Sequence, residues 1–305
     1  MRFKRFKLNS KRGQVLVLTI VFVTVMLGVA AAVVDVGAWY RTHRQMQSTA
    51  DAAALAGASG LPEDPSEASA LALDFAHRNS SGSVTADDIT FSNKLVANDT
   101  IGVTARKDVP GVFAKLFGLD SVKVRAQAKA TAGVMGQAKW AAPIGVDVMH
   151  QKLQCEPLPC FDQPTELELD KVGPGAFHLL NIDGSHGGTG NQTFAGWIET
   201  GLDAYMPLKW YYSEPGSKFN SGPVTRALDD RIGDELLFPV YRGKRAQGAG
   251  FEYEVIGWVG WHLTGYSIGG KGKLYGWFTR IVWEGIQSET TTGDDFGART
   301  IALTE

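Results

Sequence analysis

The sequence predicts an α+β protein, in which an N-terminal transmembrane helix extends into a domain with a helix on an antiparallel sheet, and a mainly β domain follows. An uncharged apolar run occupies residues 15–34, and helix-forming residues without proline continue to about residue 58. From about residue 140 the chain is rich in Gly, Trp and Tyr. We expect a basic tail at 1–13, a helix over 14–60, a small α+β domain at 61–139 and an antiparallel β domain at 140–305.

The apolar run from Val15 to Val34 contains 20 residues, the length of a helix that crosses about 30 Å of hydrocarbon. The basic tail before it should stay in the cytoplasm by the positive-inside rule, so that everything after about Asp35 is exported. A cleaved signal peptide ending near the small residues 30–32 is the alternative. Because the run exceeds the ~7–15 residues of a usual signal core, we expect a retained single-pass anchor in the lipid bilayer.

The charge distribution argues against a nucleic-acid-binding protein. Residues 1–13 hold six basic and no acidic side chains, and the whole chain has a net charge of −2, which leaves −8 for residues 14–305. A nucleic-acid-binding domain would carry a basic surface on its folded part. We therefore expect no nucleic-acid partner.

The helix should continue beyond the membrane, because residues 35–58 contain no proline and many good helix formers. Small and apolar residues recur there every three or four positions and form one face of the helix. Gly28 and Ala32 form a small-xxx-small pair that permits close helix approach within the bilayer, although lipid-facing small residues are an equal alternative. On the continuing face, the predicted packing residues are Met46, Ala50, Ala53 and Gly57.

The next segment reads as a helix followed by a small antiparallel sheet. Asp64 as N-cap, Pro65 at the first helical position and Glu67 at the third predict a helix that ends near Asn79. Alternating residues then predict strands, with an Asn-Asp turn signal between the first two. The expected strands are Ile89–Ala97, Thr100–Lys107 and Ser121–Ala132, with a short helix from Pro110 to Phe117.

The region after residue 140 shows no helical period and is expected to be a compact antiparallel β domain. A change of alternation at Gly257 predicts a bulge. The tryptophans there are expected in the core or on strand faces, and the alternative is a glycan-binding or matrix-binding surface made of Trp258, Trp261, Trp277 and Trp283. The expected strands are Phe177–Ile182, Leu236–Tyr241, Phe251–Ile268, Lys273–Trp283 and Arg299–Leu303.

Two cysteines, Cys155 and Cys160, flank a Pro-rich turn. In an exported loop such a pair most often forms a disulfide, which is our prediction. Zinc ligation is the rival interpretation, but His150 alone does not complete a four-ligand site.

Three residues around a glycine-rich turn, His178, Asp183 and His186, are the candidates for acid–base or ligand chemistry, which would suit a membrane-tethered hydrolase. The chain has no nucleotide-binding, serine-hydrolase or zinc-protease motif. A surface turn with incidental histidines is the simpler interpretation. We therefore expect no enzyme activity, no catalytic residue, no cofactor and no metal.

The N-terminal segment 12–58 resembles the N-terminal module of TadE/TadG-like Flp pilus-assembly proteins. The shared features are an RGQ entry, an apolar span leading to Asp35-Val36-Gly37, a polar Arg/Gln stretch after Tyr40, and the ending ADAAALA at 50–56. The resemblance continues more loosely to about residue 133. It adds Asp35 and Gly37 to the residues expected in membrane or helix packing.

The resemblance implies a non-enzymatic, single-pass accessory protein of a tight-adherence pilus or a related type IV-like secretion machine in the bacterial cytoplasmic membrane. A long helix on a small antiparallel sheet is similar to the architecture of pilins. A prepilin cleaved after Gly13 would carry Glu as its fifth mature residue, whereas this chain has Leu18. The expected partners are other envelope proteins of the machine and a second copy bound through the N-terminal helix.

Overall fold

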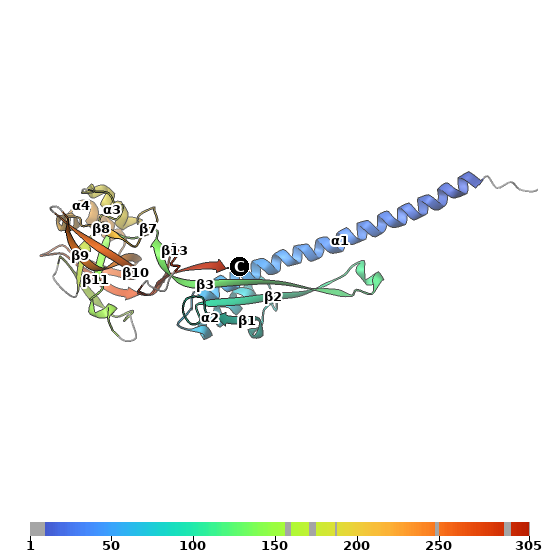
Figure 1. Ribbon diagram of the computed structural model, residues 1–305, viewed down its shortest axis with the longest axis horizontal. Helices are drawn as coiled ribbons and strands as arrows, with labels where there is room; N and C mark the ends of the chain where they lie inside the picture. Colours follow the sequence, from blue (N-terminus) through green and yellow to red (C-terminus); the bar gives the residue numbers. More distant parts are fainter. Residues whose placement is uncertain are drawn as a thin grey trace, which may run out of the picture.

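The computed structural model is an elongated molecule with a helix at one end and a rounded domain at the other (Figure 1). It describes residues 10–155, 160–170, 175–186, 188–247, 250–289 and 294–304. Helix α1 (Ser10–Ala58) projects from a narrow sheet domain, and the second domain lies at the far end of that sheet. The predicted α+β class, with a long N-terminal apolar helix followed by a mainly β domain, is confirmed.

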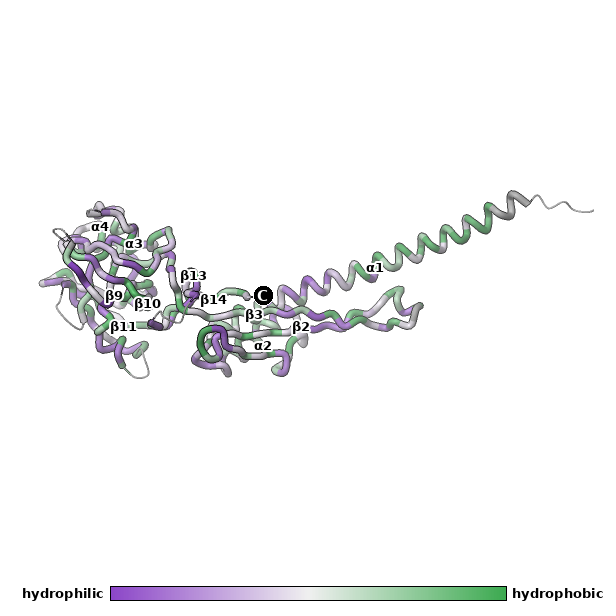
Figure 2. The backbone as a smooth tube through the Cα atoms, viewed as in Figure 1, coloured by the Kyte–Doolittle hydropathy of each residue, from purple (hydrophilic) through white to green (hydrophobic). Residues whose placement is uncertain are grey.

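Helix α1 is continuous through the apolar run and beyond it, as the absence of proline predicts. The hydroxyls of Thr19 and Thr24 donate to the carbonyl oxygens of Val15 and Ile20, at 2.9 and 2.8 Å. These two polar side chains are therefore satisfied within the helix, as a bilayer requires. Residues 15–27 of α1 project free of the rest of the protein and are almost entirely apolar (Figure 2).

The second half of α1 lies on the first domain and packs against α2 (Pro65–Asn79). Asp64 caps α2 by accepting hydrogen bonds from the backbone N–H groups of Ser66 and Glu67, as expected. Alanines at three buried positions of α2 face the small residues of α1. A Cβ added to Gly57 would lie only 2.9 Å from the carbonyl oxygen of Ala68, so the two helices approach at backbone distance.

The first sheet has the strand order β1-β2-β3-β14-β12. Along β3, alternate residues from position 124 to 130 are buried under α1, which is the predicted alternation. β3 continues past the expected end at Ala132 and pairs there with two short strands, β7 and β13. The bounds are β1 Ile89–Ser92, β2 Thr100–Pro110, β3 Ser121–Ala138, β7 Met206–Pro207, β12 Ile281–Val282, β13 Gly285–Gln287 and β14 Ala298–Thr304.

The expected strand over Ile89–Ala97 is wrong beyond Ser92, because the chain turns there. Asp99 accepts hydrogen bonds from the backbone N–H groups of Lys94, Leu95 and Val96, which closes a loop over residues 93–99. Burial of the Asp99 carboxylate raises its pKa, but these hydrogen bonds outweigh the burial and hold the pKa below its usual value.

The second sheet has the order β11-β5-β6-β4-β9-β10-β8, and β10 also pairs with β11, so that six of its seven strands form a closed ring. The sheet is mixed and not wholly antiparallel, because β4 pairs with β9 and β5 with β6 in parallel. Its strands are β4 Ile144–Asp147, β5 Thr165–Leu169, β6 Ala176–Leu179, β8 Trp210–Tyr212, β9 Glu235–Gln247, β10 Gly250–Ser267 and β11 Lys273–Thr279.

Two details separate this domain from the sequence expectation. The predicted irregularity at Gly257 is present, since the β9–β10 register shifts between Val255 and Gly257. The expectation of no helix is wrong, because α3 (Asn191–Glu199) and α4 (Gly222–Asp230) pack beside each other on this domain. Each is only 9 residues long, too short for a periodic signal to stand out. Within the described residues, four 3-10 turns complete the elements: η1 Ala86–Asp88, η2 Ala114–Phe117, η3 Gln151–Leu153 and η4 Gly216–Asn220.

The C-terminal strand returns to the first sheet. β14 pairs antiparallel with β3, from Arg299 opposite Val134 to Thr304 opposite Lys129. The domain boundary between residues 139 and 140 stays a prediction. A single boundary assigns the C-terminal strand to the second domain, whereas β14 pairs with a strand of the first sheet. The second domain is thus inserted between two neighbouring strands of the first sheet.

Arg299 fastens this return to the loop between α1 and α2. Its guanidinium donates to the carbonyl oxygen of Leu61 at 2.7 Å and to the carboxylates of Glu63 and Asp295. Burial would lower the pKa of Arg299, but the two carboxylates outweigh burial and raise it. The guanidinium therefore stays charged and holds three chain segments together.

Candidate functional site: the apolar helix and the hairpin tip docked on it

The first half of α1 is the clearest candidate for function. Among the described residues, α1 is the helix with the length and composition to cross a membrane, and the residues of its most apolar window are unburied. Large side chains along it are open to the surroundings, with Leu27 and Val33 each 66% exposed. An exposed apolar surface as long as this helix is stable only in an apolar environment such as a bilayer.

The predicted packing residues of α1 fall into two groups. Met46, Ala50, Ala53 and Gly57 are buried against the first sheet and α2, so they serve packing within the chain. Gly28, Ala32 and Gly37 are exposed, and a Cβ added at either glycine would meet no atom within 4 Å. These three exposed residues are therefore the predicted packing residues that a lipid or a partner protein can still contact.

Asp35, which is predicted to take part in membrane or helix packing, binds the tip of a hairpin in the structure. The residue is only 3% exposed, and its carboxylate accepts hydrogen bonds from the backbone N–H groups of Val112, Phe113 and Ala114, at 2.9, 3.0 and 2.6 Å. These residues lie in the tip of the β2–β3 hairpin (111–120), just where η2 begins. The first N–H groups of a helical turn have no acceptor within the turn. The Asp35 carboxylate is the acceptor for those at the start of η2.

A small apolar pocket, open on one side, lies between the docked hairpin tip and α1. The pocket has a volume of about 170 Å³ and lies between Phe113 and Ala114 on the tip and the α1 residues Gly28, Ala31, Ala32, Val36 and Trp39, with Asp35 at its edge. The tip therefore lies beside the last part of the apolar run. Sequence analysis missed this contact, although the apolar residues between Gly111 and Asp120 were a visible signal for an unusual turn.

Replacing Asp35 by alanine is expected to release the hairpin tip from α1. The change removes the acceptor of three N–H groups, and a hydrogen bond to a charged group contributes about 1.5–3 kcal/mol. Because the freed groups regain water, we expect local opening to become easier by about 2 kcal/mol. Hydrogen exchange at Val112, Phe113 and Ala114 in the full chain measures this.

The control for that substitution is Asp51→Ala on the same helix. Asp51 accepts one hydrogen bond, from the side chain of Gln47 at 2.8 Å, and does not contact the tip in this way. It should leave tip exchange at the wild-type rate. Equal exchange in wild type and Asp35→Ala would contradict the assigned role.

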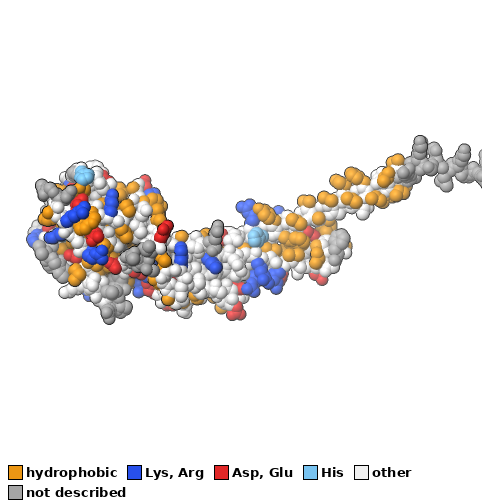
Figure 3. Space-filling view, viewed as in Figure 1, with side chains coloured by type: hydrophobic (Ala, Val, Ile, Leu, Met, Phe, Trp, Pro, Cys, Tyr) orange, Lys and Arg blue, Asp and Glu red, His pale blue; other side chains and the backbone are white. Residues whose placement is uncertain are grey.

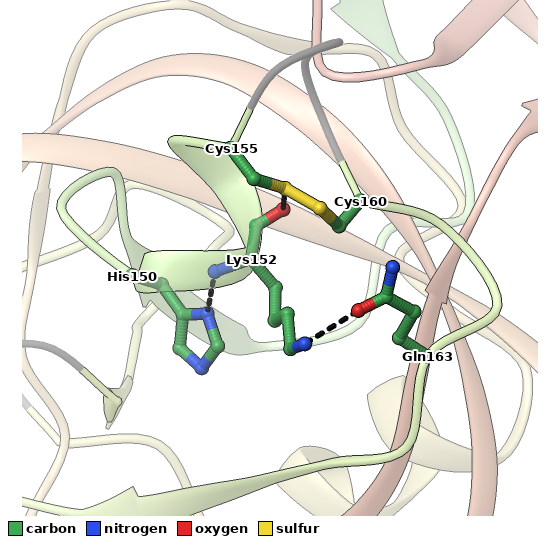
Figure 4. The surroundings of a disulfide bond; sticks show 5 residues. All are labelled: His150, Lys152, Cys155, Cys160 and Gln163. Atoms are coloured by element: carbon green, nitrogen blue, oxygen red, sulfur yellow. Dashed lines mark hydrogen bonds between the residues drawn. A yellow bond between two sulfur atoms is a disulfide. The ribbon is translucent and has the colours of Figure 1, made fainter.

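Cys155 and Cys160 are joined in a disulfide bond (Figure 4). The backbone N–H of Cys160 donates to the carbonyl oxygen of Lys152 at 2.8 Å, and the Lys152 side chain reaches Gln163. His150 accepts from the Lys152 backbone N–H and does not point at the sulfurs. The Pro-rich residues 156–159 between the cysteines lie outside the described residues.

The three candidate acid–base residues each have a separate partner. His178 pairs with Asp170 through its Nδ1 at 2.9 Å and stacks on Tyr253, whereas Asp183 accepts from the backbone N–H of Ser185 within its own turn. His186 packs on Tyr212. Across the residues that the structure describes, no three His, Cys, Asp or Glu side chains could hold one metal ion.

The phenol beside His178 is unsuited to acid–base work near neutral pH. Burial, with smaller contributions from Asp170 and Asp147, raises the pKa of Tyr253 to about 12. Tyr253 therefore remains a neutral ring that supports His178 by stacking.

The tryptophans proposed for glycan binding are mostly structural. Trp258 and Trp261 are at most 2% exposed and lie in the core of the second domain. Trp277 stacks on His262 with ring centroids 4.3 Å apart, and the indole of Trp283 donates to the carbonyl oxygen of Lys139. The two buried rings are not available to a ligand.

Comparison with known proteins identifies the first segment. Residues 13–60 match the family model Tad, described as "Putative Flp pilus-assembly TadE/G-like". The match covers the described α1 helix from Gly13 to its end and the turn after it, and it confirms the predicted N-terminal module. No curated protein and no solved structure matches the chain. The helix that projects from this molecule is therefore the segment that is similar to the TadE/G-like Flp pilus-assembly family.

Proposed function

We propose that the chain is a non-enzymatic accessory component of a Flp-type pilus or a related secretion apparatus, held in the bacterial cytoplasmic membrane by α1. The observation that carries this proposal is the projecting apolar half of α1, which belongs to the matched family segment. Its residues contact no other described part of the protein over most of their length, which suits a helix that lipid surrounds.

The proposed orientation places residues 1–13 in the cytoplasm and both domains outside. The six basic side chains of the tail favour this direction. A disulfide in the second domain is consistent with an oxidising compartment. The exported domains then lie on the outer side of the membrane and mediate contacts with other proteins of the apparatus.

Gly28 and Ala32, which stay exposed beside the hairpin tip, are the proposed contact for other membrane helices. Small residues there let a second backbone come close. The partner is another envelope protein of the apparatus or a second copy of this chain. By contrast, the four packing residues further along α1 are already buried against other parts of the chain: Met46, Ala50, Ala53 and Gly57.

Protease treatment of spheroplasts tests the orientation. With a tag at each end of the full chain, the C-terminal tag should be lost while a membrane-bound fragment keeps the N-terminal tag. Protection of the C-terminal domains would contradict the proposed direction. A mature chain that begins after Ala32 and is released from the membrane would contradict the anchor itself.

Site-specific photo-crosslinking tests the contact surface. A crosslinker at Gly28 should trap other membrane proteins or a second copy, whereas one at the buried Ala53 should give only crosslinks within the chain. Equal patterns from both positions would contradict the division of α1 into an outer contact and an inner packing segment.

A further inference from the structure

The tip of the β2–β3 hairpin exposes apolar side chains that nothing described in the chain covers. Leu116 is 81% exposed, Val112 64% and Leu119 53%, and Phe113 is 39% exposed at the edge of the pocket against α1. Exposed apolar residues gathered in one short turn indicate contact with an apolar surface.

The position of the tip along α1 indicates which surface this is. The tip is fastened to Asp35, the first charged residue after the apolar run. It borders α1 as far as Gly28, seven residues or roughly 10 Å closer to the N-terminus. The exposed residues of the tip therefore lie beside the stretch of α1 that needs hydrocarbon around it.

The part of the hairpin behind the tip carries mostly basic side chains, which suits contact with anionic lipid headgroups. Directly behind the tip, residues 106–110 and 121–125 hold four basic side chains and one acidic side chain. Basic side chains gather along the hairpin where it approaches the first domain, and apolar ones cover α1 beyond it (Figure 3). Apolar residues followed by basic ones are typical of protein segments that lie in the interface of anionic lipids.

We propose that the hairpin tip, residues 111–120, is a second membrane contact that inserts into the outer face of the bilayer beside α1. This inference rests on the proposed placement of α1 in the membrane. The Asp35 carboxylate is satisfied by the tip, so it is shielded where the helix leaves the hydrocarbon. Two contacts instead of one fix the tilt and rotation of the first domain relative to the membrane.

Lipid quenching of a fluorophore tests this proposal in the full chain. The chain is placed in phosphatidylcholine–phosphatidylglycerol nanodiscs with or without brominated acyl chains. Because the two native cysteines are joined in a disulfide, a single added cysteine can carry the probe NBD. The variants are Leu116→Cys at the tip, Val25→Cys in the apolar run and Val96→Cys as the control.

Val96 is a matched control because it is 46% exposed in a loop at the other end of β2, away from the tip. We expect brominated lipid to quench the Leu116 and Val25 probes at least twofold and to leave the Val96 probe unchanged. Quenching at Val25 but not at Leu116 overturns this inference and leaves the anchor in place. No quenching at Val25 overturns both.

Aqueous iodide separates lipid from a protein occupant. A Leu116 probe that is shielded from iodide yet not quenched by brominated lipid is covered by protein, which also overturns the proposal. Since Leu116 is almost fully exposed, its replacement leaves the fold intact, and none of these outcomes depends on a damaged protein.

Discussion

Replacing Gly57 by leucine is expected to separate α1 from α2 and to destabilise the first domain by about 3 kcal/mol, at the upper end of what overpacking costs. A Cβ at this position would already lie 2.5 Å from Ile101 and 2.9 Å from the carbonyl oxygen of Ala68. The Ile101 side chain can rotate, but the Ala68 backbone cannot. Hydrogen exchange of the β2 and β3 amides in the full chain measures the loss.

Gly37→Leu is the matched control in the same helix. Gly37 is exposed, and a Cβ there would meet no atom within 4 Å, so the first domain should keep its exchange rates. Equal destabilisation by the two substitutions would mean that the leucine acts through the helix itself and not through the contact with α2.

Replacing Trp261 by alanine is expected to destabilise the second domain by about 3–5 kcal/mol. The ring is completely buried, stacks on Phe238 with centroids 5.8 Å apart and meets Phe278 edge-on at 5.1 Å. Its loss leaves a cavity in the hydrophobic core of the second domain. Thermal unfolding followed by near-UV circular dichroism reports on this domain, which holds most of the tryptophans.

Trp277→Ala is the comparison, since Trp277 is a partly exposed tryptophan on β11, the strand next to β10. It loses a stacking contact with His262 but leaves no closed cavity, so we expect about 1 kcal/mol. A loss at Trp261 no larger than at Trp277 would contradict the central place given to Trp261 in the core.

The local features of the first domain could be predicted from the sequence. The 20-residue apolar run, the Asp64 cap and the alternation on β3 are each determined by residues close together in the chain, and the structure has all three. Composition also indicated the β-rich second region. These signals need no knowledge of what lies opposite each segment.

Features that depend on distant partners could not be predicted. Asp35 accepts from residues 77 to 79 positions away, and nothing near Asp35 indicates that a hairpin will end there. The C-terminal strand was expected, but its place beside β3 was not, because alternation does not specify a partner. Likewise, the sequence does not show which residues of the predicted face of α1 are buried and which stay exposed, because this depends on where the first sheet lies.

The return of β14 to the first sheet has a mechanical consequence. The segments into and out of the distal domain leave the first sheet at the same end, near Ala138 and Ala298, whereas α1 leaves it at the opposite end. A pull between the membrane and the distal domain would thus act parallel to the sheet and to α1. The contact between the sheet and α1 would carry this force as shear. The contacts of α1 with the sheet would have to slip together, which resists a pull far better than contacts that peel apart one after another.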